Sequence, residues 1–309
     1  LIVDGSQRSG AVRGHDHESA GHFSLSALGE YFAINMGRFS MDRAHHNVVT
    51  VPAAAKADFS GWTAAQYQGR LVRFESGPLC TWVSVESSQQ AGCFWAFRHV
   101  GLVHAPGARS YVWVIDDFNF DDGRSGAQLY EWRLHTSPGN DIIPGRRAAI
   151  LRGWRHRRLL DVFFCGEPQA PPVSLSVYRQ RCGSPSYITP KRLRRSLRAY
   201  GDHPEEMVHG PVFECPVLEA RARGLRLRLL TVLVPRADGR AKPRFRSQPL
   251  LSNTLAFELE TPEFRDSFVW AFDHGLLEGP GVEGTGQWKL VRRRPKDGGI
   301  AASQTADPI

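Results

Sequence analysis

Apolar and polar residues alternate with a period of two along much of the chain. The clearest segments are 23–27, 129–135, 173–177, 225–229 and 255–259. Because successive side chains of a strand point to opposite faces of a sheet, this pattern predicts half-buried antiparallel strands.

Two further segments, 111–115 and 159–164, are apolar at nearly every position, which predicts strands buried on both faces. Turn-forming sequences, such as Asp-Asp-Gly at 121–123 and Pro-Gly-Asn at 138–140, separate the strands. Many short strands with regular turns predict an all-β fold, a large antiparallel β-sandwich of the super-sandwich type with a small C-terminal β-region.

The composition of each segment suggests a domain organisation. Residues 1–235 are expected to form the main β-sandwich domain, and 236–249, rich in Arg, Pro and Lys, to form a linker. A small C-terminal β-region is expected over 250–294, followed by a flexible tail of small and polar residues over 295–309. One short helix is predicted over 189–201, where Thr-Pro can begin it and Gly can end it.

Charge and composition narrow the class of protein. The chain has 309 residues, 41% of them hydrophobic and 23% charged, which is typical of a folded globular protein. Its net charge of +8 suits a polyanionic partner. No RRM, zinc-finger or helix-turn-helix pattern is present, so nucleic acid is not the expected partner. The chain contains no stretch of 18 apolar residues, so no membrane-spanning helix is predicted. No signal peptide is visible, and the start at Leu1 leads us to expect a missing N-terminal part.

Several other residue types allow more than one interpretation. The eight tryptophans could stack on sugars, but most lie in apolar strand patterns that favour core packing. Asp116 and Asp117 could form a carboxylate pair for glycoside hydrolysis, but their place before a turn favours turn and capping roles. The five cysteines contain no CxxC pair, which favours buried free thiols.

Histidines are concentrated near the N-terminus, where five of the twelve lie in the first 46 residues. His15 and His17 are separated by one residue, so in an extended segment both point to the same side. Neutral imidazole is a common zinc ligand, although the same pattern also fits surface histidines in a loop.

The order of elements around these histidines is specific. His-x-His at 15–17 is followed by the strand 23–27, a second apolar strand ending in Asn-Met-Gly at 35–37, and His-His-Asn-Val-Val at 45–49. This order resembles the start of the C-terminal β-sheet domain of the heparinase II/III-like polysaccharide lyases. The resemblance extends more weakly through 111–117, 130–135 and 231–235.

This resemblance implies a fold and a site. Such lyases pack an N-terminal helical toroid, absent from this chain, on a large β-sandwich, with the active site in the cleft between them. By motif position, His15 matches the active-site histidine, His17 the first zinc ligand and His46 the final histidine ligand. His45 is an alternative to His46, although neighbouring strand residues point in opposite directions.

Asn35 departs from the pattern, because it stands where the family has an aspartate ligand. A neutral amide does not balance the charge of Zn²⁺, so the metal affinity is expected to fall and zinc occupancy stays open. Asp16, Glu18 or Asp42 could substitute for the missing carboxylate.

Arginines supply candidate substrate contacts. Arg38 and Arg43 flank Asn35 and His46 and could bind a uronate or sulfate bidentately, or be simple strand-edge charges. Denser arginines over 146–158 and 192–198 could guide an acidic polysaccharide or form a solvated face.

The resemblance implies β-elimination across a uronic-acid linkage of an acidic polysaccharide, in the bacterial cell envelope or periplasm. A base must take the C5 proton and an acid must protonate the leaving oxygen. His15 would act as the base, a toroid tyrosine as the acid, and a metal beside His15 would fix the loop. The alternative is a non-catalytic carbohydrate-binding β-sandwich that has lost the site.

Overall fold

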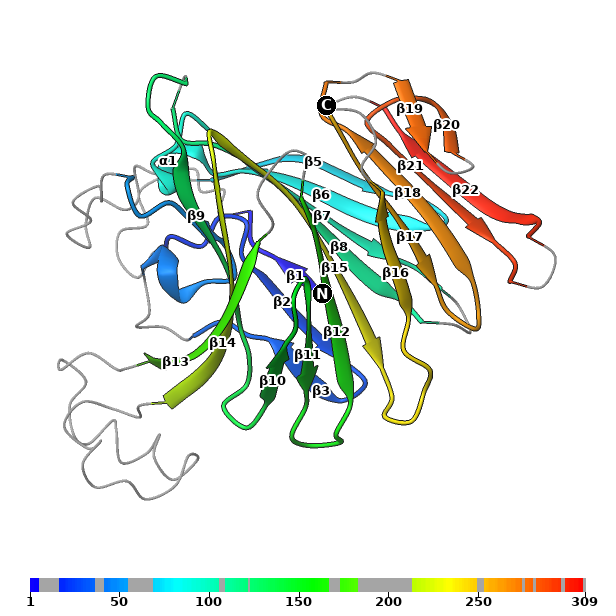
Figure 1. The fold of residues 1–309 in the computed structure, drawn as a ribbon, viewed down its shortest axis with the longest axis horizontal. Coiled ribbons are helices and arrows are strands. Elements are labelled where there is room, and N and C mark those ends of the chain that lie inside the picture. The colour runs from blue at the N-terminus through cyan, green and yellow to red at the C-terminus, as the bar shows by residue number, and fades with distance from the viewer. Residues whose placement is uncertain are drawn as a thin grey trace.

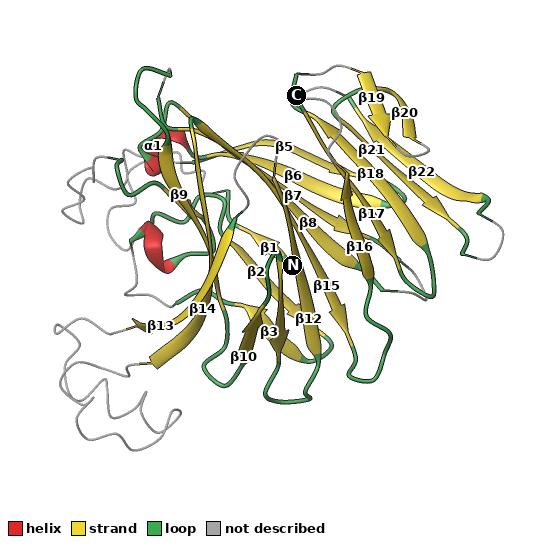
Figure 2. Cartoon of the chain, in the orientation of Figure 1, coloured by secondary structure: helices red, strands yellow, loops and turns green. Residues whose placement is uncertain are grey.

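The chain folds into three stacked layers of antiparallel β-sheet in a computed structural model (Figure 1). The structure describes residues 1–5, 17–36, 42–54, 69–105, 109–121, 123–166, 173–182, 213–248, 253–273, 276–279, 282–295 and 298–307. The helix predicted over 189–201 lies outside these residues. Strands dominate the described part, which confirms the all-β prediction (Figure 2). Its helices are the short η1 (Arg43–His45) and α1 (Ser88–Ala91). No helix among the described residues is long and apolar enough to cross a membrane.

The middle layer is an eight-stranded sheet of order β10-β11-β12-β15-β8-β7-β6-β5. Its strands are β5 (Arg70–Ser76), β6 (Cys80–Glu86), β7 (Trp95–Val103), β8 (Tyr111–Asn119), β10 (Asp141–Pro144), β11 (Ala148–Arg152), β12 (Leu159–Gly166) and β15 (Arg226–Arg236). Strand β8 shows why its central strands are apolar on both faces. Val112 and Val114 enter one hydrophobic core, whereas Trp113 and Ile115 enter the other.

One outer layer covers the first of these cores. It consists of a four-stranded sheet of order β13-β14-β9-β4 and a three-stranded sheet of order β1-β2-β3. The strands are β1 (Ile2–Val3), β2 (Phe23–Ala27), β3 (Glu30–Ala33), β4 (Val49–Thr50), β9 (Gln128–His135), β13 (Ser174–Cys182) and β14 (Phe213–Gly224). The backbone N–H of Ile34 donates to the carbonyl of His135 at 3.0 Å and ties the two sheets together.

The other outer layer is a five-stranded sheet of order β16-β17-β18-β21-β22, with a small hairpin of β19 and β20. The strands are β16 (Arg244–Gln248), β17 (Thr254–Glu260), β18 (Arg265–Ala271), β19 (Leu276–Gly279), β20 (Val282–Thr285), β21 (Trp288–Arg293) and β22 (Ile300–Ala306). Tryptophans join this layer to the middle sheet, since the Trp82 ring lies 5.9 Å from Trp270 and 6.0 Å from Trp288.

The C-terminal segments therefore differ from the expected linker and tail. The segment expected as a linker contains β16, and the segment expected as a flexible tail contains β22, which pairs with β21. The C-terminal sheet shares one hydrophobic core with the middle sheet, so the described C-terminal residues form a layer of the sandwich. The composition of β22, which is small and polar, suggested a flexible tail, but its backbone groups can still form the hydrogen bonds of a strand.

The structure confirms core packing for most of the tryptophans and free thiols for the described cysteine side chains. Five tryptophans are completely buried (Trp82, Trp113, Trp132, Trp270 and Trp288), whereas Trp95 and Trp154 are about half exposed and Trp62 lies outside the described residues. Cys80, Cys93, Cys165 and Cys215 are free thiols, and all but Cys93 are buried.

The turn and capping roles expected for Asp116 and Asp117 are wrong, because both residues lie inside β8. Their side chains point to opposite faces of the sheet. Asp116 is fully buried beside Arg98, whereas Asp117 accepts a hydrogen bond from the Trp95 indole at 3.0 Å.

Candidate functional site

Three histidine rings lie close together between the middle sheet and the outer layer that contains β2 and β9. The His46 ring centroid lies 5.3 Å from that of His17 and 5.4 Å from that of His22. His17 precedes β2, and His46 directly follows η1. The structure therefore brings together two of the predicted zinc ligands and adds a histidine that the sequence motif did not single out.

His46 is the most enclosed of these residues. Its side chain has no exposed area, and neither Nδ1 nor Nε2 has a hydrogen-bond partner among the described residues. Burial lowers the pKa of His46 to about 2, and the neighbouring His22 and His17 act in the same direction. The ring is therefore neutral at pH 7, which leaves a nitrogen lone pair for a ligand.

His22 is fixed by two hydrogen bonds. Its Nδ1 accepts the backbone N–H of Asn47 at 3.0 Å, so the proton of the neutral ring sits on Nε2, 3.1 Å from the Ser24 hydroxyl. Burial lowers the pKa of His22 to about 4, against the opposing influence of Asp4. His22 thus has both ring nitrogens engaged, unlike His46.

Asn47 connects the segments around the cluster. Its Nδ2 donates to the carbonyls of Phe23 at 2.8 Å and Ile34 at 3.1 Å. Its Oδ1 accepts the backbone N–H of His135 at 2.7 Å and lies 3.0 Å from His135 Nδ1. One buried amide therefore joins β2, the end of β3 and the end of β9, and so fixes the position of the adjacent His46.

A buried ion pair on the middle sheet holds the segments that carry His22 and His46. Arg98 on β7 contacts both carboxylate oxygens of Asp116 on β8, at 2.7 and 3.0 Å. Its remaining donors reach the carbonyl of Gly21 at 2.9 Å and the carbonyl of Asn47. Arg98 thus binds the residues next to His22 and His46 and anchors both histidine-bearing segments to the middle sheet.

Arg43, expected at the substrate, has a structural position. Its guanidinium is buried and donates to the carbonyls of Val49 at 2.9 Å and Ala20 at 3.3 Å, and to the Ser87 hydroxyl at 3.3 Å. Its backbone N–H donates to the Glu18 carboxylate at 3.1 Å. A direct contact of this guanidinium with substrate would require these bonds to break.

The other predicted site residues are spread over described and undescribed segments. Asn35 is exposed directly after β3, whereas His46 is fully buried. His15 and Arg38 lie outside the described residues, as does Asp16. Among the described residues, no three His, Cys, Asp or Glu side chains are placed to hold a metal ion together. His17 and His46 could therefore supply two imidazole ligands of a zinc ion.

Three residues of the site could not be read from the motif. His22 lies directly before the strand 23–27, and Asn47 lies within the motif at 45–49 but received no role there; only the folded contacts show that both line the cluster. His135 ends a predicted strand, and burial lowers its pKa to about 4. The alternation at 129–135 directs Leu134 inward and His135 to the opposite face, so the sequence pattern gave no signal for it.

Comparison with known proteins supports the fold. No protein-family model and no curated protein matches the sequence. The crystal structure of heparinase III superposes with a TM-score of 0.55 at 10% identity, covering 83% of this chain and 36% of that chain. The heparan sulfate lyase HepC from Pedobacter heparinus gives a TM-score of 0.51 at 13% identity, covering 79% of this chain and 35% of that chain. A heparinase III structure with methylated lysines gives 0.52 at 10% identity, with 83% and 36% covered.

These similarities define the class of fold: the chain has a heparinase III-like β-sandwich. It spans a little more than a third of the length of the chains it resembles.

Proposed function

We propose that this chain is the β-sandwich part of a polysaccharide lyase that cleaves a uronic-acid-containing acidic polysaccharide by β-elimination. The observation that carries the proposal is the meeting of His17 and His46, two motif positions 29 residues apart, in a heparinase III-like fold. Solved structures with this fold include heparinase III and a heparan sulfate lyase, which supports an acidic polysaccharide as substrate.

In this proposal His15 takes the C5 proton of the uronate. Arg38 binds the substrate carboxylate or a sulfate, because neutralising that carboxylate makes the C5 proton more acidic. Arg43 acts indirectly, by holding the segment that carries His46. A tyrosine of a helical toroid domain, outside this chain, protonates the leaving oxygen. The cleft between the toroid and the sandwich forms the site.

Zinc is proposed at His17 and His46, with Asn35 as a third ligand. When bound, the ion would fix the histidine-bearing loop beside His15 rather than act on the substrate. The nitrogen lone pair of the buried, neutral His46 ring supports this assignment.

Zinc content of the purified chain tests the site directly. We expect close to one zinc per chain in the wild type, loss of zinc in His17→Ala, and retention in His104→Ala. His104 is a matched control because its ring is 2.8 Å from the Thr81 hydroxyl, outside the cluster. A wild-type chain that binds no zinc would contradict the metal assignment.

Activity is tested on the protein as its gene encodes it, by the ultraviolet absorbance of the unsaturated uronate that β-elimination leaves. Product with a uronate polymer and none with a neutral polymer supports the lyase. Binding of the polymer without product would favour a non-catalytic carbohydrate-binding sandwich, to which the neutral Asn35 gives some support. A cell-envelope or periplasmic location is part of the proposal, because such polymers lie outside the cytoplasm.

A further inference from the structure

A groove lies at the edge of the sandwich, where the five-stranded sheet ends and the middle sheet continues. Strand β16 is the edge strand of the outer sheet, and β10 and β11 extend beyond it (Figure 1). The groove has a volume of about 480 Å³, within the range of about 300–1,000 Å³ usual for small-ligand pockets. Its floor includes Ile143 and Ile150, and Ile143 is 48% exposed.

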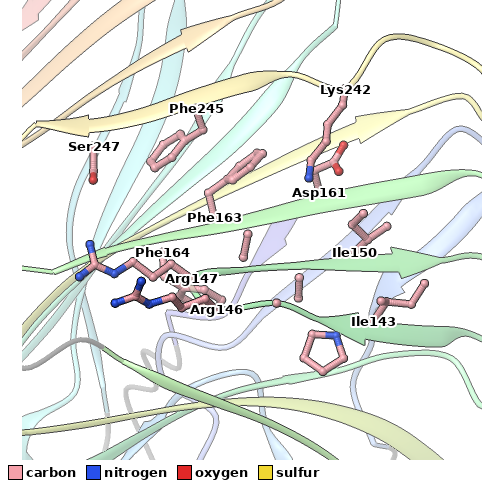
Figure 3. A pocket seen from close by; sticks show the side chains of 14 residues that line it. Ile143, Arg146, Arg147, Ile150, Asp161, Phe163, Phe164, Lys242, Phe245 and Ser247 are labelled. Atoms are coloured by element: carbon pink, nitrogen blue, oxygen red, sulfur yellow. The ribbon is translucent and has the colours of Figure 1, made fainter.

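Three cations surround this groove. Arg146 and Arg147 come from the turn between β10 and β11, and Lys242 comes from the segment before β16 (Figure 3). All three are exposed, and among the described residues none forms an ion pair with a carboxylate. The acidic residue of the lining, Asp161, is already bound by Arg236 at 2.5 Å. The groove therefore has an excess of positive charge, which favours an anionic ligand.

An aromatic pair forms the wall between the two groups of cations. The rings of Phe163 and Phe245 stack at 4.8 Å with an interplanar angle of 10°. Phe245 is only half-buried, so part of its ring faces the groove. Aromatic faces pack against the C–H faces of sugar rings, whereas guanidinium groups bind sulfates and carboxylates bidentately. The groove therefore combines an aromatic face for a sugar ring with guanidinium groups for its anionic substituents.

The groove is separate from the histidine cluster. Phe163 packs in the core between the middle sheet and the five-stranded sheet, whereas His135 ends β9 of the opposite outer layer. The two sites thus lie on opposite sides of the middle sheet.

We infer that this groove, lined by Arg146, Arg147, Lys242 and Phe245, is a second binding site for an acidic oligosaccharide, remote from the histidine site. The ligand class rests on the proposed function, because the charge alone suits other polyanions. Such a site would hold a polymer chain on the protein and raise its local concentration at a cleavage site.

Equilibrium binding to the 309-residue chain tests the inference without any need for turnover. The probe is a size-defined heparin hexasaccharide, titrated by calorimetry at low ionic strength, with a neutral maltohexaose beside it. We expect heparin binding that weakens with added salt, and no maltohexaose binding. Arg146→Gln with Arg147→Gln should weaken heparin binding about tenfold, since each lost contact is a charge-assisted hydrogen bond.

A matched control removes the same charge from the same region. Arg244 and Arg246 flank Phe245 on β16, so their side chains point away from the groove. The variant Arg244→Gln with Arg246→Gln should change heparin affinity less than about twofold. Phe245→Leu keeps an apolar side chain in the wall and should weaken heparin binding while leaving the thermal midpoint nearly unchanged.

Three results would overturn the inference. Equal loss of affinity in the two arginine pairs would show binding by net charge alone. No heparin binding by the wild type would remove the site, whatever the outcome of the lyase assay. Competition by polyglutamate or duplex DNA at the same concentration of charge would show that the groove does not select a sugar. Because lyase activity is not measured, a chain without that activity still tests the groove.

Discussion

Replacing Asp116 with asparagine should destabilise the fold strongly. The Arg98 guanidinium is only 1% exposed and contacts both carboxylate oxygens, so Asp116→Asn leaves a buried cation without its counter-charge. Loss of one partner of a buried pair costs about 3–5 kcal/mol. An asparagine would also turn one acceptor into an N–H that faces the guanidinium. That loss is a large fraction of the ~5–15 kcal/mol by which most domains are stable.

Asp117→Asn is the matched control, because it makes the same change at the next residue on the opposite face. Its partner Arg228 is 3.5 Å away and keeps the Asn253 side chain as an acceptor at 2.9 Å, so the loss should be smaller, about 1 kcal/mol. Urea unfolding followed by tryptophan fluorescence gives both values. Hydrogen exchange should also rise in Asp116→Asn at residues 20–22 and 46–48, since Arg98 holds the carbonyls of Gly21 and Asn47.

A double-mutant cycle with Arg98→Met isolates the pair. The double variant should be less destabilised than the sum of the single variants, because no unpaired charge remains buried. Equal losses in Asp116→Asn and Asp117→Asn, or simple additivity in the cycle, would refute the reasoning that this ion pair anchors the histidine segments.

Two further predictions concern stability and depend on the buried residues His99 and Gly101. Burial alone lowers the pKa of His99 to about 3 in the folded chain. As the pH falls below about 6.5, the pKa of an unfolded histidine, His99 is therefore protonated in the unfolded chain but stays neutral in the folded chain. Between pH 7 and pH 5 the wild type should lose about 2 kcal/mol more unfolding free energy than His99→Gln; parallel losses would contradict this. Gly101→Ala would place a Cβ 2.1 Å from the Trp113 indole and should lower stability by about 1–3 kcal/mol. Gly126→Ala meets nothing within 4 Å and should unfold at nearly the wild-type urea midpoint; similar midpoints for both variants would show that the core yields.

The sequence predicted the layers better than their assembly. Alternation at 129–135 and the apolar run at 111–115 reported which faces are buried, because side-chain direction along a strand is a local property. Which sheet covers each face depends on contacts between distant residues. Hence Trp270 and Trp288 were assigned to a core, but the shared core with Trp82 and the role of β22 could be seen only in the fold.

The candidate site shows the same division. The motif placed His17 and His46 in one site because their spacing resembles a known pattern, and the structure brings their rings together. Its place between Asn35 and His46 suggested a substrate contact or a strand-edge charge for Arg43, although three acceptors hold its guanidinium inside. The turn at 121–123 suggested a turn or capping role for Asp116, because the strand was expected to end before it. Both expectations concern charged side chains whose partners are brought to them only by the fold.

The enclosed His46 ring links the fold to the proposed chemistry. A buried imidazole without hydrogen-bond partners costs about 1–3 kcal/mol relative to one that is satisfied, and an apolar side chain of similar size would fill the same space without that cost. Asn47 and Arg98 fix the backbone on either side of the cluster through buried bonds to one outer layer and to the middle sheet. The fold thus holds in place a ring whose nitrogens have no hydrogen-bond partner among the described residues, which supports the proposed zinc ligand at His46.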